Sequence, residues 1–440
     1  MPDRKIRLGV LTVFLLAIII GAWLYLSGGR ARLPVEAVTG PTPQITAPRP
    51  RIVPAFNFVK AVGWPDGAKP RPATGLNVKA FADKLDHPRW MQVLPNGDVL
   101  VAETAAPPSE GGGIRDWIMG LAMDRVGADV SSANRITLLR DVNGDGVADR
   151  RSVLLKGLNS PFGMALVGDH LYVGNTDALV RFPFKVGQTR IEAPAEKILS
   201  LPGGGHWTRN VVANADGSKL YVAIGSDSNV AENGMEAEAN RATIIEVDTK
   251  TRDYRIYAAG LRNPVGMAWE PTTDALWTVV NERDGLGGDL VPDYLTAVQF
   301  GGFYGWPWYY WGGYTDSRAP EPERDMRQYT VRPDYALGPH VAALGLTFAD
   351  SAALGPRFTD GAFVGLHGSW NRKPLSGYKV IYVPFKSGRP AGKPVDVLTG
   401  FLNDDQEAQG RPVGVAIDGK GALLVADDVG NRIWRVAAGK

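Results

Sequence analysis

From about residue 75 to the C-terminus, the hydrophobic positions form short alternating runs separated by turn residues. Long stretches with the 3.6-residue period of a helix are scarce. Alternation with a period of two indicates strands, and the Gly and Pro residues between the runs indicate turns. The pattern therefore predicts an all-β protein.

One pattern of two strands joined by a turn recurs along this region. Its copies begin near His87, Ser160, Trp207, Gly260, Val341 and Gly410. Six ordered copies predict a six-bladed β-propeller, in which radial repetition protects the strand edges. We expect residues 77–81 to complete the last blade beside residues 432–436. A multi-domain β protein with generic hairpins is the alternative.

The N-terminus carries a different pattern, a nearly unbroken apolar run over residues 8–26 after Arg4, Lys5 and Arg7. A helix of that length would extend roughly 28 Å, about the hydrocarbon thickness of a bilayer. Residues 1–30 are thus expected to form an N-terminal transmembrane helix, with a cleaved signal segment as the second choice. The basic residues before the run place the remainder on the periplasmic side of the inner membrane.

Two further boundaries follow from composition. Residues 31–73 are rich in proline and lack periodicity, which predicts a Pro-rich linker. Residues 74–440 form the predicted propeller and catalytic domain. The chain has no cysteine, which excludes disulfides, thiolate metal sites and a cysteine nucleophile. Its formal net charge of +2 gives no argument for a nucleic-acid partner.

His206 is the candidate catalytic residue. It follows the three glycines 203–205 and precedes Trp207 and Arg209. An imidazole ionises near neutral pH, which suits a general base. A lone histidine is more often a surface or core residue, as we expect for His170.

Cationic and polar residues stand at equivalent ends of several repeats. In a propeller these ends surround one channel mouth, where arginine forks would suit a ligand with several carboxylates. The candidate binding residues are Arg209, Arg262, Asn263, His367, Arg372 and Arg411.

Two segments are candidates for metal binding. The first segment resembles the start of a calcium loop, because oxygen-bearing side chains stand at its positions 1, 3, 5 and 9, namely Asp141, Asn143, Asp145 and Asp149. Position 12, however, is Ser152 instead of the usual glutamate. The alternative is a hairpin turn closed by Asx residues, and either would lie at the periphery. The second segment, residues 281–289, could hold a hard cation or form an ion-paired loop.

Other catalytic patterns are missing from the sequence. It contains no phosphate-binding glycine loop, dinucleotide fingerprint or His-Glu-x-x-His motif, and residues 366–370 lack the spacing of a nucleophile elbow. Hydride chemistry would therefore need a cofactor other than a Rossmann-bound nicotinamide.

These segments together resemble the glucose/sorbosone dehydrogenase family, most closely its L-sorbosone dehydrogenase-like branch. The resemblance spans nearly the whole chain after residue 75 and is carried by residues 134–149, 206–210, 226–234, 260–266, 280–296, 301–307, 365–372, 410–415 and 424–436. It implies a six-bladed propeller that holds pyrroloquinoline quinone (PQQ) and Ca²⁺ at the channel mouth.

The resemblance also implies roles for individual residues. His206 matches the base that takes the substrate's hydroxyl proton, and Arg262 with Asn263 matches a pair that contacts cofactor and substrate. Gly285 and Leu286 fall where backbone carbonyls bind the cofactor's calcium. His367 stands at a position that is lysine in the soluble glucose enzymes, and Arg411 matches one of their late arginines, so both are expected to bind the cofactor. Arg209 lies where the family's histidine motif continues to a basic residue.

Departures from the glucose enzymes bear on the substrate. Gly205 replaces the acidic residue before the histidine, Gln409 replaces a late arginine, and Leu286 replaces a proline. The expected function is PQQ-dependent oxidation of a sugar, a sorbosone-like aldehyde or a related alcohol, with electrons passed to a separate acceptor. A calcium-dependent lactonase and a non-catalytic binding propeller are the alternatives.

Overall fold

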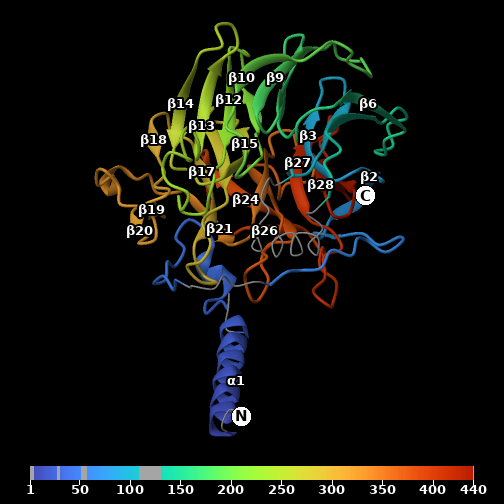
Figure 1. The fold of residues 1–440 in the computed structure, drawn as a ribbon. Coiled ribbons are helices and arrows are strands. Elements are labelled where there is room, and N and C mark those ends of the chain that lie inside the picture. The colour runs from blue at the N-terminus through green and yellow to red at the C-terminus, as the bar shows by residue number, and fades with distance from the viewer. Residues whose placement is uncertain (1–3, 27–29, 51–56, 109–129, 440) are drawn as a thin grey trace.

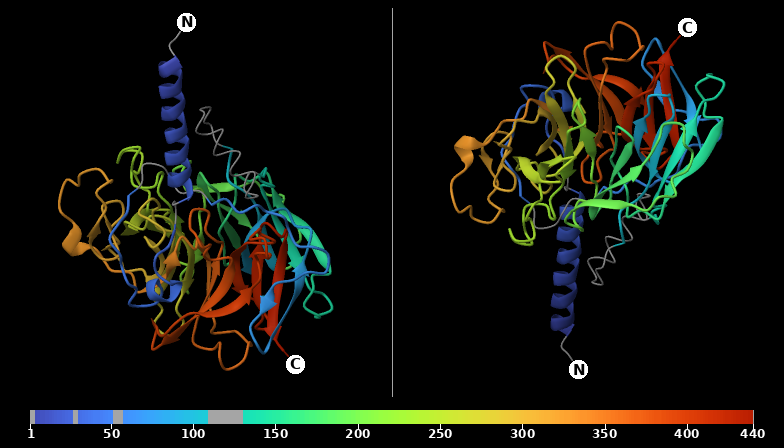
Figure 2. Two further views of the ribbon diagram at one scale, coloured as in Figure 1. Left: turned by 90° about the horizontal axis from the view of Figure 1, so that it is seen from below. Right: turned by 90° about the horizontal axis from the view of Figure 1, so that it is seen from above.

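The protein is described by a computed structural model, which covers residues 4–26, 30–50, 57–108 and 130–439. Helix α1 (Arg4–Leu26) projects from a body built almost entirely of strands, as all views show (Figures 1 and 2). Two 3₁₀ turns, η1 (Val35–Val38) and η2 (Arg327–Tyr329), are the other helical elements in the described residues.

The body is a ring of six blades, each a sheet with four main antiparallel strands. Blades one and two contain β3 (Pro88–Val93), β4 (Val99–Glu103), β5 (Arg135–Arg140) and β6 (Arg150–Lys156), then β7 (Met164–Val167), β8 (His170–Gly174), β9 (Ala178–Pro183) and β10 (Glu196–Ser200). Blades three and four contain β11 (Val211–Ala213), β12 (Lys219–Ile224), β13 (Thr243–Asp248) and β14 (Tyr254–Ala259), then β15 (Pro264–Trp269), β16 (Leu276–Val280), β17 (Pro292–Ala297) and β21 (Tyr335–Pro339). Blades five and six contain β22 (Ala343–Phe348), β23 (Gly361–Leu366), β24 (Lys379–Lys386) and β26 (Val395–Thr399), then β27 (Pro412–Ile417), β28 (Leu423–Asp427), β29 (Arg432–Ala438) and β2 (Leu76–Ala82).

Short strands extend some blades. They are β1 (Arg71–Pro72) and β25 (Arg389–Pro390) on blade five, β18 (Gly302–Phe303) on blade three, and the separate hairpin of β19 (Tyr309–Tyr310) and β20 (Tyr314–Thr315). β18 to β20 belong to an insertion between β17 and β21.

The ring is closed by the N-terminal strand. β2 pairs with β29 in antiparallel register, with Val78 opposite Val436 and Ala80 opposite Trp434. In Figure 1 blue β2 accordingly lies in the red last blade. This confirms the predicted pairing of residues 77–81 with 432–436. The six predicted repeats coincide with the six blades, so the propeller prediction is confirmed.

Glycines in the repeat have a packing function. The first strands of successive blades contact one another around the ring. A Cβ on Gly163 would lie 2.3 Å from the Val211 nitrogen, and one on Gly345 would lie 2.2 Å from the Val413 carbonyl oxygen. A Cβ on Gly414 would lie 2.7 Å from the Arg89 carbonyl oxygen. Glycine therefore recurs in the motif because larger residues would push neighbouring blades apart.

The predicted linker lies against the propeller in its described parts. Buried Asp289 accepts hydrogen bonds from the backbone N–H groups of Arg32 (2.9 Å) and Leu33 (3.4 Å), and from the Arg49 side chain (3.2 Å). Further along, Trp64 Nε1 donates to Asp427 (2.7 Å). We call residues 30–50 and 57–70 the strap, because they run across the loops of blades four to six.

The expected transmembrane helix is not supported. Within the described residues, no helix combines the length and the apolar character that a bilayer span requires.

Candidate active site

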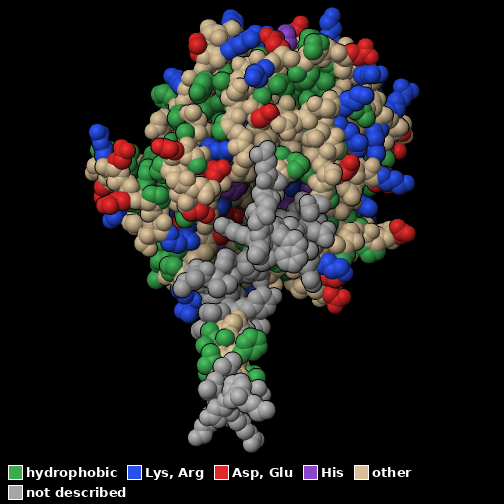
Figure 3. Space-filling model, viewed as in Figure 1, with side chains coloured by type: hydrophobic (Ala, Val, Ile, Leu, Met, Phe, Trp, Pro, Cys, Tyr) green, Lys and Arg blue, Asp and Glu red, His purple; other side chains and the backbone are tan. Residues whose placement is uncertain are grey.

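One face of the ring gathers most of the predicted site residues. The first two strands of each blade are antiparallel, so the residues before each first strand and after each second strand lie at the same end. Such positions are occupied by residues 206–210, 225–229, 262–263, 281–284, 340–342, 367 and 427–428. Figure 3 shows histidine side chains within a hollow on the side of the molecule that carries α1.

His206 is held in one tautomer by its neighbours. Its Nδ1 lies 2.8 Å from the Ser226 carbonyl oxygen, which can only accept, so Nδ1 carries the hydrogen. The Ser226 hydroxyl donates to the Ser228 carbonyl (2.7 Å) and leaves a lone pair toward Nδ1 at 3.1 Å. Nε2 is therefore the unprotonated nitrogen of a neutral ring. Burial and the positive charge of Arg262 lower the pKa of His206 to about 3, so the ring is neutral at pH 7.

Arg262 and Asn263 lie beside His206, as predicted. A Cβ on Gly225 would lie 2.4 Å from Asn263 Oδ1 and 2.6 Å from His206 Cβ, which places the two side chains against the same glycine. Arg262 donates to the carbonyls of Asn229 (3.2 Å) and Glu282 (2.9 Å) and to Asn229 Oδ1 (3.0 Å). It is thus fixed from two blades.

An ion pair between the partly exposed Asp284 and the buried His340 borders the same group. Asp284 Oδ2 lies 3.9 Å from Arg262, while its Oδ1 lies 3.0 Å from His340 Nδ1 and accepts a hydrogen bond from Asn371 (2.7 Å). Burial opposes the charge on Asp284, but the hydrogen bond and charge of His340, the charge of Arg262 and the hydrogen bond from Asn371 together outweigh it and lower the pKa of Asp284 to about 2. Burial likewise opposes the charge on His340, yet its partner Asp284 raises the pKa of His340.

A second charged cluster lies on blades one, five and six. Asp428 Oδ2 is 2.6 Å from Arg89, 2.8 Å from His367 Nε2 and 3.5 Å from His87 Nε2. The Arg89 guanidinium lies 5.6 Å from the centre of the Trp207 ring, which connects this cluster to the residue after His206. Burial lowers the pKa of His367 to about 4 against the opposing effect of Asp428.

Arg411 stands close to this second cluster. It donates to the Tyr378 hydroxyl (2.8 Å) and its positive charge acts on His367. The structure therefore brings His367 and Arg411 together, and adds Arg89 and Asp428 to them.

Both groups contain buried polar atoms that have no hydrogen-bond partner in the described structure. They are Arg89 Nε, Arg411 Nε, Asn263 Oδ1, Asn371 Oδ1 and Asp428 Oδ1. Leaving a buried polar atom unpaired costs about 1–3 kcal/mol. Donors and acceptors from four blades thus remain available, which fits a polar ligand that carries carboxylates and carbonyls.

Arg209 has a different environment from the one expected. It is fully buried and donates to carbonyls of its own loop, those of His206 (2.6 Å), Thr208 (2.9 Å) and Pro202 (2.6 Å). Burial lowers the pKa of Arg209 to about 9. These contacts hold the backbone that carries His206.

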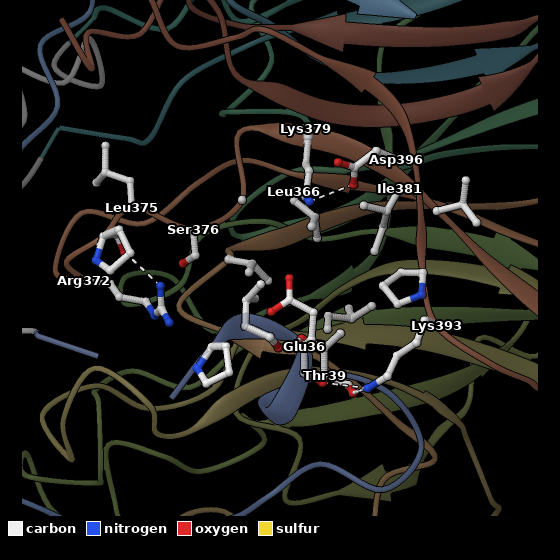
Figure 4. Close-up of a pocket in the computed structure, with 18 of the residues that line it drawn as sticks. Glu36, Thr39, Leu366, Arg372, Leu375, Ser376, Lys379, Ile381, Lys393 and Asp396 are labelled. Carbon is white, nitrogen blue, oxygen red and sulfur yellow. Dashed lines mark hydrogen bonds and ion pairs between the residues drawn. The ribbon is translucent and has the colours of Figure 1, made fainter. Parts of the chain in front are cut away.

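Arg372 lies at a separate cavity of about 690 Å³ (Figure 4). It donates to the carbonyls of Gly288 (2.8 Å) and Pro374 (2.9 Å). The strap residues Glu36 and Thr39 and the pair Lys379–Asp396 also line this cavity. The structure does not group Arg372 with His206.

The predicted metal ligands occupy two regions. The Leu286 carbonyl accepts a hydrogen bond from the Arg49 N–H (2.9 Å), whereas the Gly285 carbonyl has no donor among the described residues. Asp141–Asp149 forms the hairpin between β5 and β6, with Asp141 bound by the N–H groups of Gly144 (2.7 Å) and Gly146 (2.9 Å) and by Lys420 (3.2 Å).

The remaining hairpin residues also bond within the turn. Asn143 donates to Asp149 (3.0 Å), and Asp145 Oδ1 accepts from the Val147 N–H (2.8 Å). In the part of the chain that the structure covers, no three His, Cys, Asp or Glu side chains are arranged to share a metal ion. The hairpin contacts favour the Asx turn, while calcium there stays a prediction.

A cavity of about 660 Å³ lies beside the residues on either side of His206, although His206 itself does not line it. It is lined by the glycines 203–205 and Trp207, and by Thr176 and Asp177 of the loop between β8 and β9 in blade two. Its size lies within the range of small-molecule sites.

Sequence reasoning missed Arg89, Asn229, His340 and Asp428 on this face, and it included Asp284 only within the possible cation site or ion-paired loop at residues 281–289. Pro88 begins β3 as Pro264 begins β15, so His87 stands in the first repeat where Asn263 stands in the fourth, and the repeat register could have indicated that position. His340 and Asp428 follow no motif, and only the ring closure brings them to the site.

The fold and site define a six-bladed propeller with a polar channel mouth around a neutral histidine. The chain belongs to the TrAA12-like family, whose model matches residues 70–292 and 317–438.

Individual relatives agree with this assignment. An aldose sugar dehydrogenase of Escherichia coli is 26% identical over 312 residues, which cover 67% of this chain and 78% of the relative. An uncharacterised protein of Borreliella burgdorferi is 31% identical over 239 residues, so the match spans 52% of this chain and only 60% of that protein. The PQQ domain of pyranose dehydrogenase from Coprinopsis cinerea, solved in its holo form, shares the fold with a TM-score of 0.65 at 20% identity, over 86% of this chain and all of that domain. The predicted membership in a family of PQQ-dependent sugar dehydrogenases is confirmed, whereas the sorbosone branch stays a prediction.

Proposed function

We propose that this protein is a PQQ-dependent oxidoreductase that oxidises a sugar, a sugar aldehyde or a related alcohol, with His206 as the base. The observation that carries the proposal is the tautomer of His206. Because Nδ1 is committed to the Ser226 carbonyl, Nε2 offers a lone pair at the channel mouth. A neutral imidazole with one free nitrogen can take the proton of a substrate hydroxyl.

The residues around His206 fit PQQ. The unpaired Nε atoms of Arg89 and Arg411 are donors for carboxylates, and the Asn263 amide is fixed beside His206. When bound, PQQ supplies the two-electron acceptor for the hydride of the substrate. Arg262 and Asn263 orient the reacting groups, and Arg209 holds the backbone of His206. For Ca²⁺, the Gly285 carbonyl, which has no donor among the described residues, fits better than that of Leu286, which already accepts from Arg49.

Reconstitution tests the reaction class. Purified protein is loaded with PQQ and Ca²⁺, and reduction of an artificial electron acceptor is followed over a panel of aldoses, aldehydes and polyols. We expect reduction that requires both PQQ and substrate. An absence of PQQ binding and of dye reduction across the panel would contradict the proposal, and lactone hydrolysis with Ca²⁺ alone would favour a lactonase.

Substitution tests the base. We expect His206→Ala to lower kcat by about 10²–10⁴-fold, the usual contribution of general base catalysis, with PQQ affinity largely kept. His170→Ala is the matched control, since His170 lies partly exposed at the start of β8 and, among the described residues, its ion-pair partner is its neighbour Asp169. Unchanged turnover in His206→Ala would remove His206 from its role.

We also propose that residues 1–30 direct the propeller out of the cytoplasm, to the periplasm. The support is the basic cluster at residues 4–7 before an apolar run. Fractionation of cells that express the full chain and a variant lacking residues 1–30 tests this. Equal amounts of both in the cytoplasm would contradict it.

A further inference from the structure

A cavity of about 690 Å³ lies between the strap and blades four and five (Figure 4). Its wall is mainly aliphatic. The propeller contributes Leu337, Leu366, Leu375 and Ile381, and the strap contributes Leu33 and Val35. The volume lies within the range of small-molecule sites, about 300–1,000 Å³. The cavity therefore suits a ligand with an apolar body.

Arg372 brings a hydrogen-bond donor to this aliphatic wall. The residue is 2% exposed, and its Nε and Nη1 already donate to the carbonyls of Gly288 (2.8 Å) and Pro374 (2.9 Å). Its Nη2 donates to none of the described residues. In Figure 4 Arg372 lies at the left of the cavity, near Leu375. An arginine N–H can only donate, so a ligand here needs an acceptor oxygen at the end of its apolar body.

Glu36 argues against an anionic ligand. Its carboxylate has no partner among the described residues, and it points into the cavity in Figure 4. The lysines of the lining are engaged, because Lys379 pairs with Asp396 (2.7 Å) and Lys393 donates to two strap carbonyls (2.6 and 2.8 Å). Arg357 is exposed. A carboxylate on the ligand would be repelled by Glu36, whereas a neutral carbonyl would not.

The cavity lies directly behind the candidate active site. Three of its wall residues, Val341, Leu366 and Arg372, are chain neighbours of residues on the active-site face. Those neighbours are His340, His367 and Asn371. A molecule in the cavity is thus separated from the channel mouth by little more than the chain segments that carry these residues. The strap side of the cavity precedes residue 70, where the family match begins, so it is an addition to the shared ring.

The proposed reaction needs a molecule that collects its electrons. The chain has no cysteine, so it holds neither a cysteine-ligated iron–sulfur cluster nor a haem attached through cysteines. We propose that the cavity behind the active site binds the electron acceptor, and that this acceptor is a para-quinone with an apolar chain. The inference rests on the proposed function and names the partner of that same site.

A para-quinone matches each feature of the cavity. One neutral carbonyl accepts from Arg372 Nη2, the apolar chain lies along the aliphatic wall, and no charge opposes Glu36. The quinone takes two electrons and two protons from the reduced cofactor and leaves as the quinol, which returns the cofactor to its oxidised form. A fatty acid would place its carboxylate in the same cavity as that of Glu36.

The first experiment measures binding to the apoprotein and is independent of activity. Decylubiquinone is the probe, and isothermal titration calorimetry is the readout. We expect saturable binding to the wild type and about tenfold weaker binding to Leu375→Trp and to Val35→Trp, because a tryptophan from either wall would fill the cavity. Val153→Trp is the matched control, since Val153 is exposed on β6 and does not line the cavity.

Three results would overturn the proposal. They are no binding of the quinone, equal affinity of the wild type and both cavity variants, and tighter binding of decanoate than of decylubiquinone. The last result would assign the cavity to an aliphatic carboxylate. Two variants on opposite walls, Val35 on the strap and Leu375 on blade five, keep the test decisive if one of them fails to fold.

The second experiment uses the PQQ-loaded enzyme with two acceptors, decylubiquinone and ferricyanide. We expect the rate with the quinone, divided by the rate with ferricyanide, to fall about tenfold in the two cavity variants and to stay at the wild-type value in Val153→Trp. Reduction of ferricyanide without reduction of the quinone would overturn this inference and leave the proposed function standing. Reduction of neither acceptor would overturn both.

Discussion

At the scale of the residue, the candidate site depends on Gly225, because this residue has no side chain. Gly225 follows β12 and has no positive φ, so its backbone does not require glycine. The space above its Cα is filled by Asn263 and His206 instead. The glycine therefore lets two functional side chains from different blades touch.

Gly225→Ala should disrupt this contact. A methyl group would overlap Asn263 Oδ1 at 2.4 Å and His206 Cβ at 2.6 Å, so both side chains must shift. A misplacement of about 1 Å near the reacting groups can cost 10²-fold in rate. We expect kcat to fall by about that factor in the PQQ-loaded enzyme. Gly203→Ala is the control, because nothing lies within 4 Å of its Cβ position, and it should keep wild-type turnover. Equal activity of the two variants would contradict the packing argument.

At the scale of the element, the strap is the feature that composition described least well. Its prolines predict an extended chain, and apart from η1 the strap is extended. They do not show whether that chain docks on the propeller. Docking is decided by Asp289, a buried carboxylate after β16 that binds three donors of the strap.

Asp289→Ala should loosen residues 30–50 without unfolding the ring. Hydrogen bonds to a buried charge contribute about 1.5–3 kcal/mol each, so the strap would lose much of its docking free energy. We expect faster amide exchange and faster proteolysis within residues 30–50, with little change in the blades. Asp396→Ala removes the half-exposed Lys379–Asp396 pair and should cost about 0–1 kcal/mol. Equal protection of the strap in wild type and Asp289→Ala would refute this role of Asp289.

At the scale of the whole molecule, the ring buries several histidines, and burial favours the neutral form of their imidazole rings. Burial lowers the pKa of His367 to about 4 and also lowers the pKa of His87. In the unfolded chain these rings have a pKa of about 6.5. Between the two values the unfolded state binds more protons, so acid destabilises the fold.

The contribution of His367 to the free energy of unfolding should therefore fall as pH drops from 6.5 toward 4. For His367 alone the expected loss between pH 6.5 and pH 5 is about 2 kcal/mol. His340, Asp293 and Asp427 oppose this trend, because, against the effect of burial, Asp284 raises the pKa of His340, and burial raises the pKa of Asp293 to about 7 and that of Asp427 to about 6. Urea unfolding of the apoprotein and of His367→Gln at pH 7, 6 and 5 isolates the contribution of His367 as the difference between the two slopes. An unchanged slope in the variant would contradict this account.

The amino-acid sequence by itself determined the blades. Alternation, turn residues and the recurring glycine are local requirements of strands that pack around an axis, so they are visible in every copy. The position of His206, Arg262 and Asn263 at one end of the ring could also be predicted, because these residues stand at equivalent ends of the repeats.

Only the tertiary structure decided which charges meet. Arg209 and Arg372 look like Arg262 in the sequence, yet Arg209 is buried against the carbonyls of its own loop and Arg372 lines a separate cavity. His340 and Asp428 come from segments with no motif, and Asp284 comes from the segment 281–289, whose role the sequence left open. All three reach the site because ring closure brings loops of distant blades to one end. Pairing and burial are properties of that assembly, and no local pattern encodes them.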